Sequence, residues 1–280
     1  MTICIVSPHL DDAILSCGVL IQRAIADGNR VIIANIFSKG TNSSQRQAEE
    51  KAAADVIGAE TVFLDELDAP DRDPNFSSPD QIFFGRIESV SENFIEHLRD
   101  RLKKLFLDEG VQTAYFPLVA GNHIDHRIMH LVGRKMRNTN ILFYEDRPYV
   151  VWPGVLNGRF NGLNVKADLP DVGADDMAET LGQYSYHNLI PKGAFNEKNL
   201  PKFQDMLNTP DNYCAQANVV ETVEGTQDEI RKTYKALEKY DSQMPLIFPS
   251  YDVFVQESMA FEHFRSGAEV YTERFWSINA

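Results

Sequence analysis

The sequence predicts an α/β fold: a Rossmann-like three-layer sandwich with a mostly parallel sheet in the order 3-2-1-4-5, followed by a C-terminal elaboration. Two observations predict it. Short apolar runs alternate with helical patterns through the first 150 residues, and the 43% hydrophobic content of this 280-residue chain can fill one large core. We expect one domain over 1–280, with the Rossmann-like core at 1–150.

The strands and helices of this core follow from hydrophobic periodicity. Glycines stand where several of the helices should end, at Gly28, Gly58 and Gly110. The expected strands are 2–7, 30–37, 61–64, 112–117 and 140–144. The expected helices begin near 13, 46, 90 and 126.

The pattern changes after the fifth strand. Residues 151–225 are rich in Gly, Asn, Asp and Pro, which predicts a loop-rich or lid-like insertion. A helix returns at Thr226, where Thr226 and Glu229 form a capping-box pattern ahead of an apolar stripe. Residues 226–280 are therefore expected to supply C-terminal helix and strand elements.

Composition excludes several classes of protein. The net charge of −14, without a basic stripe, argues against nucleic-acid binding. No run approaches the roughly 20 apolar residues that span a bilayer, and the first residues lack a signal-peptide pattern, so we expect a cytoplasmic protein without a transmembrane segment. Three unpaired cysteines suggest neither a disulfide framework nor a thiolate zinc site. A homo-oligomer is compatible with the sequence.

Two clusters of histidine and aspartate follow the first and fourth expected strands. The first is Ser7-Pro-His9-Leu-Asp11-Asp12, and the second is Gly121-Asn-His123-Ile-Asp125-His126. In the 3-2-1-4-5 order these strands are neighbours across the switch point, where ligands bind outside the carboxyl ends. We therefore expect the two clusters to meet in one crevice.

Imidazole and carboxylate ligands suit a catalytic Zn²⁺, which takes three protein ligands and one water; another divalent metal is compatible. His9 and Asp12 lie three residues apart, so one turn can present both. The third ligand is His126 or His123. Asp11 is left as a general base, and the remaining histidine can stabilise the oxyanion. Asp125 can orient that histidine or support a ligand through a hydrogen bond.

These residues carry a resemblance. SPHLDDAILSCG followed by GNHIDH resembles the PIG-L/LmbE-like family of zinc-dependent N-acetylglucosaminyl deacetylases, and the likeness extends through Arg46-Gln-Ala-Glu49 and weakly into Tyr240-Asp-Ser242-Gln243. It implies His9, Asp12 and His126 as metal ligands, Asp11 as base, His123 as acid or oxyanion stabiliser, and Arg46 as a sugar contact. The sequence departs from the family pattern at Leu10, Ala13 and Ile124, none of which removes a ligand.

Other acidic residues are candidates for substrate binding. The stretch 143–149, which contains Glu145, resembles a segment of some family members and should face the crevice; Glu145 then contacts substrate or stabilises a turn. Asp68 and Asp71 contact sugar or are ordinary loop acids. Tyr184 and Tyr186 line a sugar subsite or pack in the core.

The function that these features predict is removal of an N-acetyl group from an amino sugar in a small glycoconjugate or natural-product intermediate. A metal-dependent phosphoesterase is the alternative, since His/Asp clusters at strand ends also build two-metal sites. A non-catalytic sugar-binding module is a third hypothesis. The intact set of ligands and base argues against it.

Overall fold

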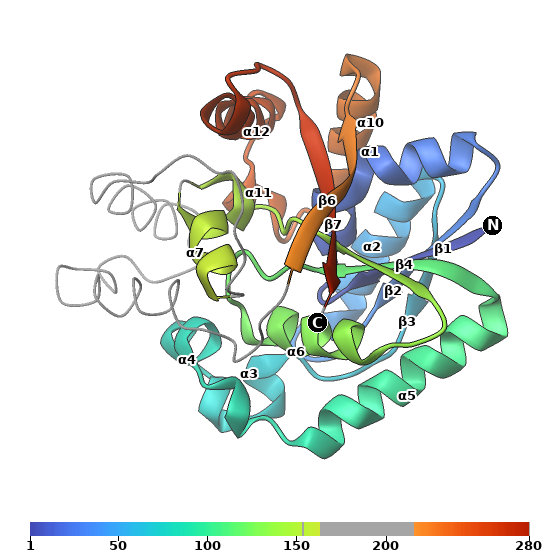
Figure 1. The fold of residues 1–280 in the computed structure, drawn as a ribbon, viewed down its shortest axis with the longest axis vertical. Helices are drawn as coiled ribbons and strands as arrows, with labels where there is room; N and C mark the ends of the chain where they lie inside the picture. The colour runs from blue at the N-terminus through green and yellow to red at the C-terminus, as the bar shows by residue number, and fades with distance from the viewer. Residues whose placement is uncertain (153, 163–215, 280) are drawn as a thin grey trace, which may run out of the picture.

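The computed structural model describes residues 1–152, 154–162 and 216–279, and in them the strands form one seven-stranded mixed sheet (Figure 1). The strand order is β3-β2-β1-β4-β5-β7-β6. Strands β1 to β5 pair in parallel, which confirms the predicted 3-2-1-4-5 core. The strands are β1 (Thr2–Ser7), β2 (Arg30–Asn35), β3 (Glu60–Phe63), β4 (Val111–Pro117), β5 (Asn140–Tyr144), β6 (Gln216–Glu224) and β7 (Thr272–Asn279).

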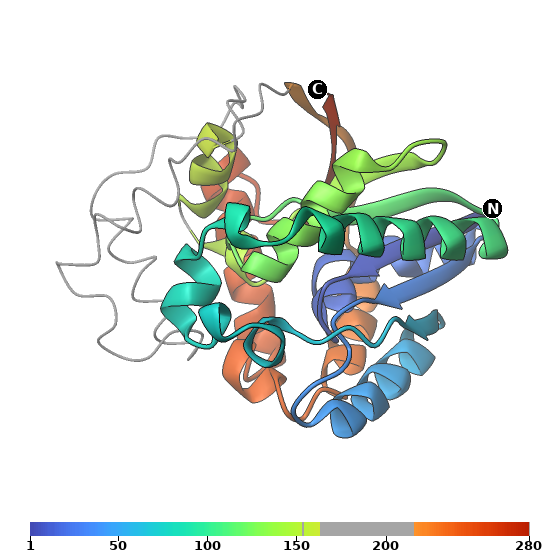
Figure 2. The ribbon, with the colours of Figure 1, turned by 90° about the horizontal axis from the view of Figure 1, so that it is seen from below.

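Helices cover both faces of the sheet, as Figures 1 and 2 show. Helices α5 and α6 lie on one face, and α1, α2 and α10 lie on the other. The main helices are α1 (Asp12–Ala26), α2 (Ser43–Ile57), α5 (Glu92–Glu109), α6 (Ile124–Lys135), α10 (Gln227–Leu237) and α12 (Tyr251–Ser266). Shorter elements are α3 (Ala69–Arg72), η1 (Pro74–Phe76), α4 (Pro79–Phe84), η2 (Ile87–Ser89), η3 (Tyr149–Val151), α7 (Val155–Gly162) and α11 (Met244–Ile247).

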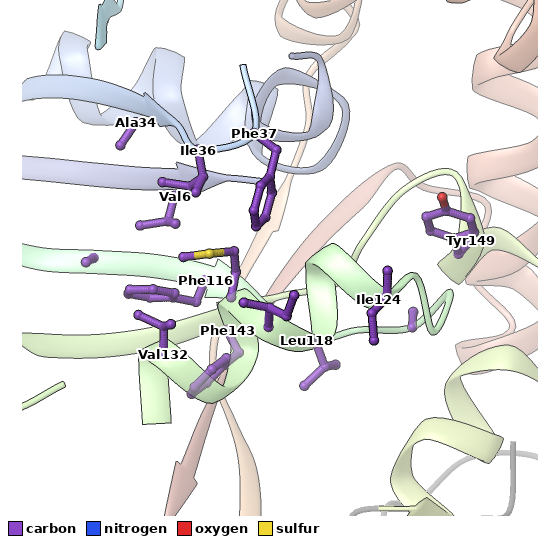
Figure 3. Close-up of a cluster of buried hydrophobic side chains, with 14 of the residues drawn as sticks. Val6, Ala34, Ile36, Phe37, Phe116, Leu118, Ile124, Val132, Phe143 and Tyr149 are labelled. Atoms are coloured by element: carbon purple, nitrogen blue, oxygen red, sulfur yellow. The ribbon is translucent and has the colours of Figure 1, made fainter. Parts of the chain in front are cut away.

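Two hydrophobic cores, one on each side of the sheet, hold these layers together. Successive strand residues point to opposite faces, so Val6 enters one core while Ile5 enters the other. In the first core Phe116 of β4 and Phe143 of β5 meet Val132 of α6 (Figure 3). Burial on both faces explains why these strands read as continuous apolar runs rather than alternating ones.

Helix α1 is interrupted at Cys17, whose φ of −132° and ψ of 19° are not helical. The interruption leaves backbone N–H groups without helical acceptors. The carboxylate of Glu273 on β7 accepts hydrogen bonds from the backbone nitrogens of Val19 (2.8 Å) and Leu20 (2.9 Å). A β7 side chain therefore caps the second half of the helix whose first half follows the β1 turn.

Some elements differ from the sequence prediction. Strands β7 and β6 extend the sheet beyond β5 in antiparallel fashion, and β6 pairs with β7 across more than 40 residues of chain. Periodicity carries no information on such long-range pairing. Helix α7 and strand β6 lie within 151–225, where loops were expected, while Tyr184 and Tyr186 lie outside the described residues.

No helix of the described segments is long and apolar enough to cross a membrane. Cys4 and Cys17 are buried free thiols.

Candidate metal centre

The turn between β1 and α1 is fixed by its own polar side chains. The hydroxyl of Ser7 donates to the carbonyl of His9 (2.6 Å) and accepts from the backbone nitrogen of Ala13 (3.0 Å). The backbone nitrogen of His9 donates to Oδ2 of Asp12 (2.8 Å). Between them Asp11 has a φ of 143°, a strained conformation for a residue with a side chain. One hydroxyl and one backbone N–H thus hold the turn that presents His9, Asp11 and Asp12.

The loop between β4 and α6 is held from β5. Oδ2 of Asp146 accepts hydrogen bonds from the backbone nitrogens of Val119 (2.6 Å) and Ala120 (3.1 Å). Val119 also has a positive φ of 71°, so this contact stabilises an unusual backbone. His123 then caps α6, since its Nδ1 accepts the backbone N–H of Asp125 (3.2 Å).

The two clusters meet, as the strand order requires. Oδ2 of Asp12 lies 3.4 Å from Nδ1 of His9 and 3.2 Å from Nε2 of His126. A tetrahedral Zn²⁺ with bonds of about 2.0–2.1 Å places its ligand atoms roughly 3.3 Å apart. Nε2 of His126 is buried without a hydrogen-bond partner among the described residues. These atoms fit a divalent metal, which would satisfy that nitrogen.

In His9 and in His126, the ring nitrogen that faces away from Asp12 contacts a second carboxylate. Nε2 of His9 lies 3.1 Å from Oδ2 of Asp125, and Nδ1 of His126 lies 2.7 Å from Oδ1 of Asp146. Carboxylates in this position orient metal-binding histidines and fix the tautomer that faces the metal. Asp125 is itself held by Arg72 (2.5 Å). Asp125 therefore supports His9, and it contacts His123 only through its backbone N–H.

His123 is the rival third ligand. His9, His123 and His126 each offer a nitrogen within 4.8 Å of the others. Unlike His9 and His126, His123 uses its Nδ1 to accept a backbone N–H. In the neutral ring the proton is therefore on Nε2. Burial, followed by the nearby imidazoles, holds the pKa of His123 well below its usual value, so the ring stays neutral. A neutral Nε2–H is a hydrogen-bond donor.

The charges at this centre favour cations. Burial lowers the pKa of His126, but the carboxylates of Asp12 and Asp146 outweigh burial and raise this pKa to about 10. In the same way Asp12 and Asp125 outweigh burial and raise the pKa of His9 to about 9. A metal bound between these residues displaces the protons of the His9 and His126 imidazoles, which the carboxylates stabilise. Its binding should therefore release protons and strengthen with rising pH.

Asp11 lies beside this group and is 5% exposed. Burial, reinforced by the adjacent charge of Asp12, raises the pKa of Asp11 to about 7 although Arg46 opposes the shift. Nη2 of Arg46 lies 3.9 Å from Oδ2 of Asp11. A carboxyl that titrates near neutral pH can both take up and return a proton.

A cavity of about 310 Å³ opens onto these groups. Its lining includes residues that follow the carboxyl ends of β1 and β4 and residues of α4 and α11. Figure 1 shows where these two helices lie. Its lining comprises His9, Asp11, Asp12, Leu15, Arg46, Asp68, Pro70, Ile82, Phe83, His123, Pro148, Tyr149, Gln243, Leu246 and Ile247.

Only some of the residues predicted to bind substrate line the cavity. Arg46 lines the cavity, and its Nε is buried without a partner among the described residues. Asp71 does not line the cavity and instead accepts a hydrogen bond from the backbone nitrogen of Thr41 (2.6 Å). Its neighbour Asp68 does line the cavity, with a buried Oδ1 that has no partner in the described segments.

Glu145, for which the sequence left substrate contact or stabilisation of a turn open, does not line this cavity. It is 3% exposed, accepts from Arg265 (2.8 Å) and from the indole of Trp276 (2.9 Å), and so joins β5 to α12 and β7. The stretch 143–149 nevertheless reaches the cavity through Pro148 and Tyr149.

Sequence reasoning missed Asp146 and Arg72 as supports of the two imidazoles. Asp146 carried a usable signal, because it follows a central strand at the same edge as both clusters. Arg72 carried none, since its pairing with Asp125 joins residues 53 positions apart.

Comparison with known proteins finds deacetylases both by sequence profile and by fold. Residues 4–136 match the profile of the PIG-L family, described as GlcNAc-PI de-N-acetylase. None of the curated proteins matches in sequence. Among solved structures, the A40926 pseudoaglycone deacetylase is 17% identical, with a TM-score of 0.62 over 99% of this chain and 96% of that one.

Two further structures share the fold. A triple mutant of a deacetylase of the teicoplanin biosynthetic pathway is 16% identical, with a TM-score of 0.62 over 100% of this chain and 99% of that one. The N,N'-diacetylchitobiose deacetylase from Pyrococcus horikoshii is 16% identical, with a TM-score of 0.50 over 99% of this chain and 83% of that one. The match to the PIG-L family model over residues 4–136 therefore includes both His/Asp clusters, and it supports an N-deacetylase enzyme.

Proposed function

We propose that this protein is a zinc-dependent hydrolase that removes the N-acetyl group from an amino sugar of the N-acetylglucosamine type, within a small glycoconjugate or a natural-product intermediate. The observation that carries the proposal is the carboxylate of Asp12, which lines the cavity and lies 3.4 Å from the imidazole of His9 and 3.2 Å from that of His126.

His9, Asp12 and His126 would hold the metal. When bound there, Zn²⁺ would polarise the amide carbonyl and lower the pKa of water toward about 7. Asp125 and Asp146 keep the two imidazoles in the orientation that this requires, because each carboxylate accepts from the nitrogen on the opposite side of the ring.

Asp11 moves the proton. Its carboxylate takes a proton from the attacking water as the oxygen–carbon bond forms, and the acid so formed gives that proton to the amide nitrogen as the carbon–nitrogen bond breaks. The products are acetate and the free amine. The pKa of Asp11, which burial raises to about 7, suits both halves of this cycle.

His123 stabilises the charge that develops on the carbonyl oxygen. Its Nδ1 accepts a backbone N–H, so Nε2 carries the proton that can be donated. A neutral donor is suited to this task, since its hydrogen bond strengthens as the oxygen becomes negative.

The polar side of the cavity would bind the sugar. Arg46 and Asp68 both have a buried polar atom without a partner in the described residues, so hydroxyl groups of a ligand would satisfy them. Solved structures of this fold include deacetylases of the A40926 pseudoaglycone and of N,N'-diacetylchitobiose, which supports an amino-sugar substrate for this chain.

Acetate release tests the proposal. Protein freed of metal by a chelator is loaded with one equivalent of Zn²⁺, and acetate is measured with N-acetylglucosamine glycosides. We expect release that needs the metal and that falls at least 100-fold in Asp11→Asn. Asp108→Asn, an exposed carboxylate on α5, is the matched control. Because one teicoplanin deacetylase is described in a zinc-inhibited form, metal is also titrated beyond one equivalent.

Equal rates with and without metal, or in Asp11→Asn, would contradict this function. The phosphoesterase alternative requires ligands for a second metal. Among the described residues one group of three or more potential ligands is found, at His9, His123 and His126. Two metals per chain in elemental analysis would revive that alternative.

A further inference from the structure

Helix α4 packs against α6, and two side chains near the start of α6 hold the end of α4 there. The side-chain amide of Asn122 donates to the carbonyl of Phe83 (2.6 Å), and Nη1 of Arg127 donates to the carbonyl of Gly85 (2.7 Å). The last carbonyls of a helix have no partner within the helix, so these two donors satisfy groups that would otherwise need water. The end of α4 is therefore tied to the loop that carries His123.

Asn122 is itself held in an unusual conformation. Its φ is 59°, in the left-handed region, which asparagine adopts more readily than most residues that have a side chain. The next residue is His123, the N-cap residue of α6. One residue thus both turns the chain into α6 and binds the end of α4.

The ring of Phe83 packs against the imidazole of His123. The two ring centroids lie 5.4 Å apart with the planes at 90°. The imidazole of His9 meets the same ring at 4.7 Å and 77°. Phe83 is 4% exposed, so its ring has little room to move within a close-packed interior. Phe83 therefore contacts this loop twice, through its carbonyl at Asn122 and through its ring at His123.

The orientation of the His123 ring needs more than its own hydrogen bond. Nδ1 of His123 accepts the backbone N–H of Asp125 (3.2 Å), and a single hydrogen bond leaves a ring free to tilt about the N–H···N axis. The edge-on contact with Phe83 opposes that tilt. Orientation matters because His123 lines the cavity, and a donor misplaced by about 1 Å can cost about 100-fold in rate.

We propose that Asn122 is a positioning residue for His123. By holding the carbonyl of Phe83, its amide keeps the Phe83 ring against the imidazole, and this contact keeps Nε2 of His123 directed at the substrate carbonyl. Asn122 itself does not line the cavity. The inference rests on the proposed function, in which His123 donates to the developing oxyanion. The alternative is a structural contact that stabilises the loop without affecting the reaction.

The test removes the hydrogen bond and keeps the backbone conformation. Asn122→Gly deletes the amide, and glycine adopts a left-handed φ without strain. Asn138→Gly is the matched control, because Asn138 is an exposed asparagine with a φ of 67° in the turn after α6, outside the cavity. For each variant, kcat and KM with an N-acetylglucosamine glycoside and the dissociation constant of Zn²⁺ are measured, alone and in the His123→Ala background.

We expect Asn122→Gly to lower kcat about tenfold with KM and metal affinity unchanged, because the positioned donor acts in the transition state. Asn138→Gly should leave kcat unchanged. In the His123→Ala background Asn122→Gly should cost nothing further, since no imidazole is left to position.

A wild-type kcat for Asn122→Gly would overturn the proposal. A loss of kcat that persists without His123, a rise in KM alone, or weaker binding of Zn²⁺ would overturn it too, because each assigns Asn122 to another part of the site. If Asn122→Gly does not fold, Asn122→Asp takes its place in the same cycle. That variant keeps the volume, replaces the donor with an acceptor, and is judged by the same outcomes.

A measurement without turnover separates this proposal from the proposed function. In zinc-loaded protein, NMR that correlates imidazole nitrogens with their protons shows which nitrogen of His123 is protonated, and the signals are assigned by their loss in His123→Ala. We expect the proton on Nε2 in the wild type and in Asn138→Gly, and a mixture of both tautomers in Asn122→Gly.

That result supports the positioning role even if the wild type releases no acetate, an outcome that contradicts the proposed function alone. Identical His123 signals in the wild type and in Asn122→Gly would overturn the positioning role, whereas metal-dependent acetate release would still support the deacetylase.

Discussion

Oδ1 of Asp146 lies 2.7 Å from Nδ1 of His126, and both side chains are almost fully buried. The second oxygen of Asp146 accepts the backbone N–H groups of Val119 and Ala120. One carboxylate at the end of β5 thus fixes both the candidate ligand and the loop that carries it.

Replacing Asp146 should weaken metal binding while leaving the ligands themselves in place. We expect Asp146→Asn to bind Zn²⁺ about 10- to 100-fold more weakly, because the ring of His126 loses the charged partner that fixes its tautomer. Competition with a chromophoric chelator measures the dissociation constant. Asp100→Asn, at an exposed position of α5, is the control. An unchanged dissociation constant in Asp146→Asn would show that the contact does not serve the metal.

His123→Ala distinguishes a ligand from an oxyanion stabiliser. If His9, Asp12 and His126 hold the metal, His123→Ala retains one equivalent of Zn²⁺ and loses about 10²- to 10³-fold in kcat. His126→Ala is the contrasting variant and should lose the metal. Metal content is measured by elemental analysis beside acetate release. Loss of metal from His123→Ala would make the three imidazoles the ligand set.

Gly121 is packed against the ring of Tyr149. A Cβ atom built at Gly121 would lie 2.1 Å from Cγ of that ring, which is too close for any real contact. Gly121→Ala should therefore lower the free energy of unfolding by about 1–3 kcal/mol and displace the loop that carries His123. Urea denaturation of both single variants and of Gly121→Ala/Tyr149→Ala measures this. A double variant whose loss equals the sum of the single losses would contradict a direct clash.

Glu273 predicts a pH dependence of stability. Burial raises its pKa to about 7 from the model-compound value of 4.5, although Arg147 and the N–H groups of Val19 and Leu20 oppose the shift. A raised folded-state pKa contributes stability that is present below pH 4.5 and lost as the pH rises through 7. Relative to Glu273→Gln, the wild type should therefore lose on the order of 3 kcal/mol between pH 4.5 and 8.

Denaturant melts of the metal-free wild type and Glu273→Gln at several pH values give this difference directly. Because other titrating groups are common to both proteins, their contributions cancel in the comparison. Parallel pH profiles for the two proteins would mean that Glu273 titrates normally.

The parallel core was predictable because the central strands β1 and β2 are almost entirely buried on both faces and helices α1, α5 and α6 each carry an apolar stripe. The meeting of His9 with His126 was predictable too, since the strand order brings the ends of β1 and β4 together. The antiparallel addition of β7 and β6 to the sheet was not, because a pairing such as that of Trp276 in β7 with Phe143 in β5 depends on register between distant segments.

The sequence predicted the residues that line the cavity less well. Asp68 and Asp71 are three residues apart in the same loop, yet only Asp68 lines the cavity. The difference between them comes from a local contact: Asp71 accepts a hydrogen bond from the backbone N–H of Thr41. The periodicity of the sequence does not encode such a contact. Glu145 and Asp146 likewise point to different partners, because adjacent residues leaving a strand face opposite sides.

The cap that Glu273 places on α1 joins residues 254 positions apart in the chain. Pairing at such separation forms late, since the entropy of closing so long a loop must be met before the contact stabilises anything. We therefore expect the first helix of the metal centre to acquire its final shape only when β7 has docked against β5. An isolated segment ending near residue 136 would contain every candidate ligand but would leave the N–H groups of Val19 and Leu20 uncapped, and we expect it to bind metal weakly.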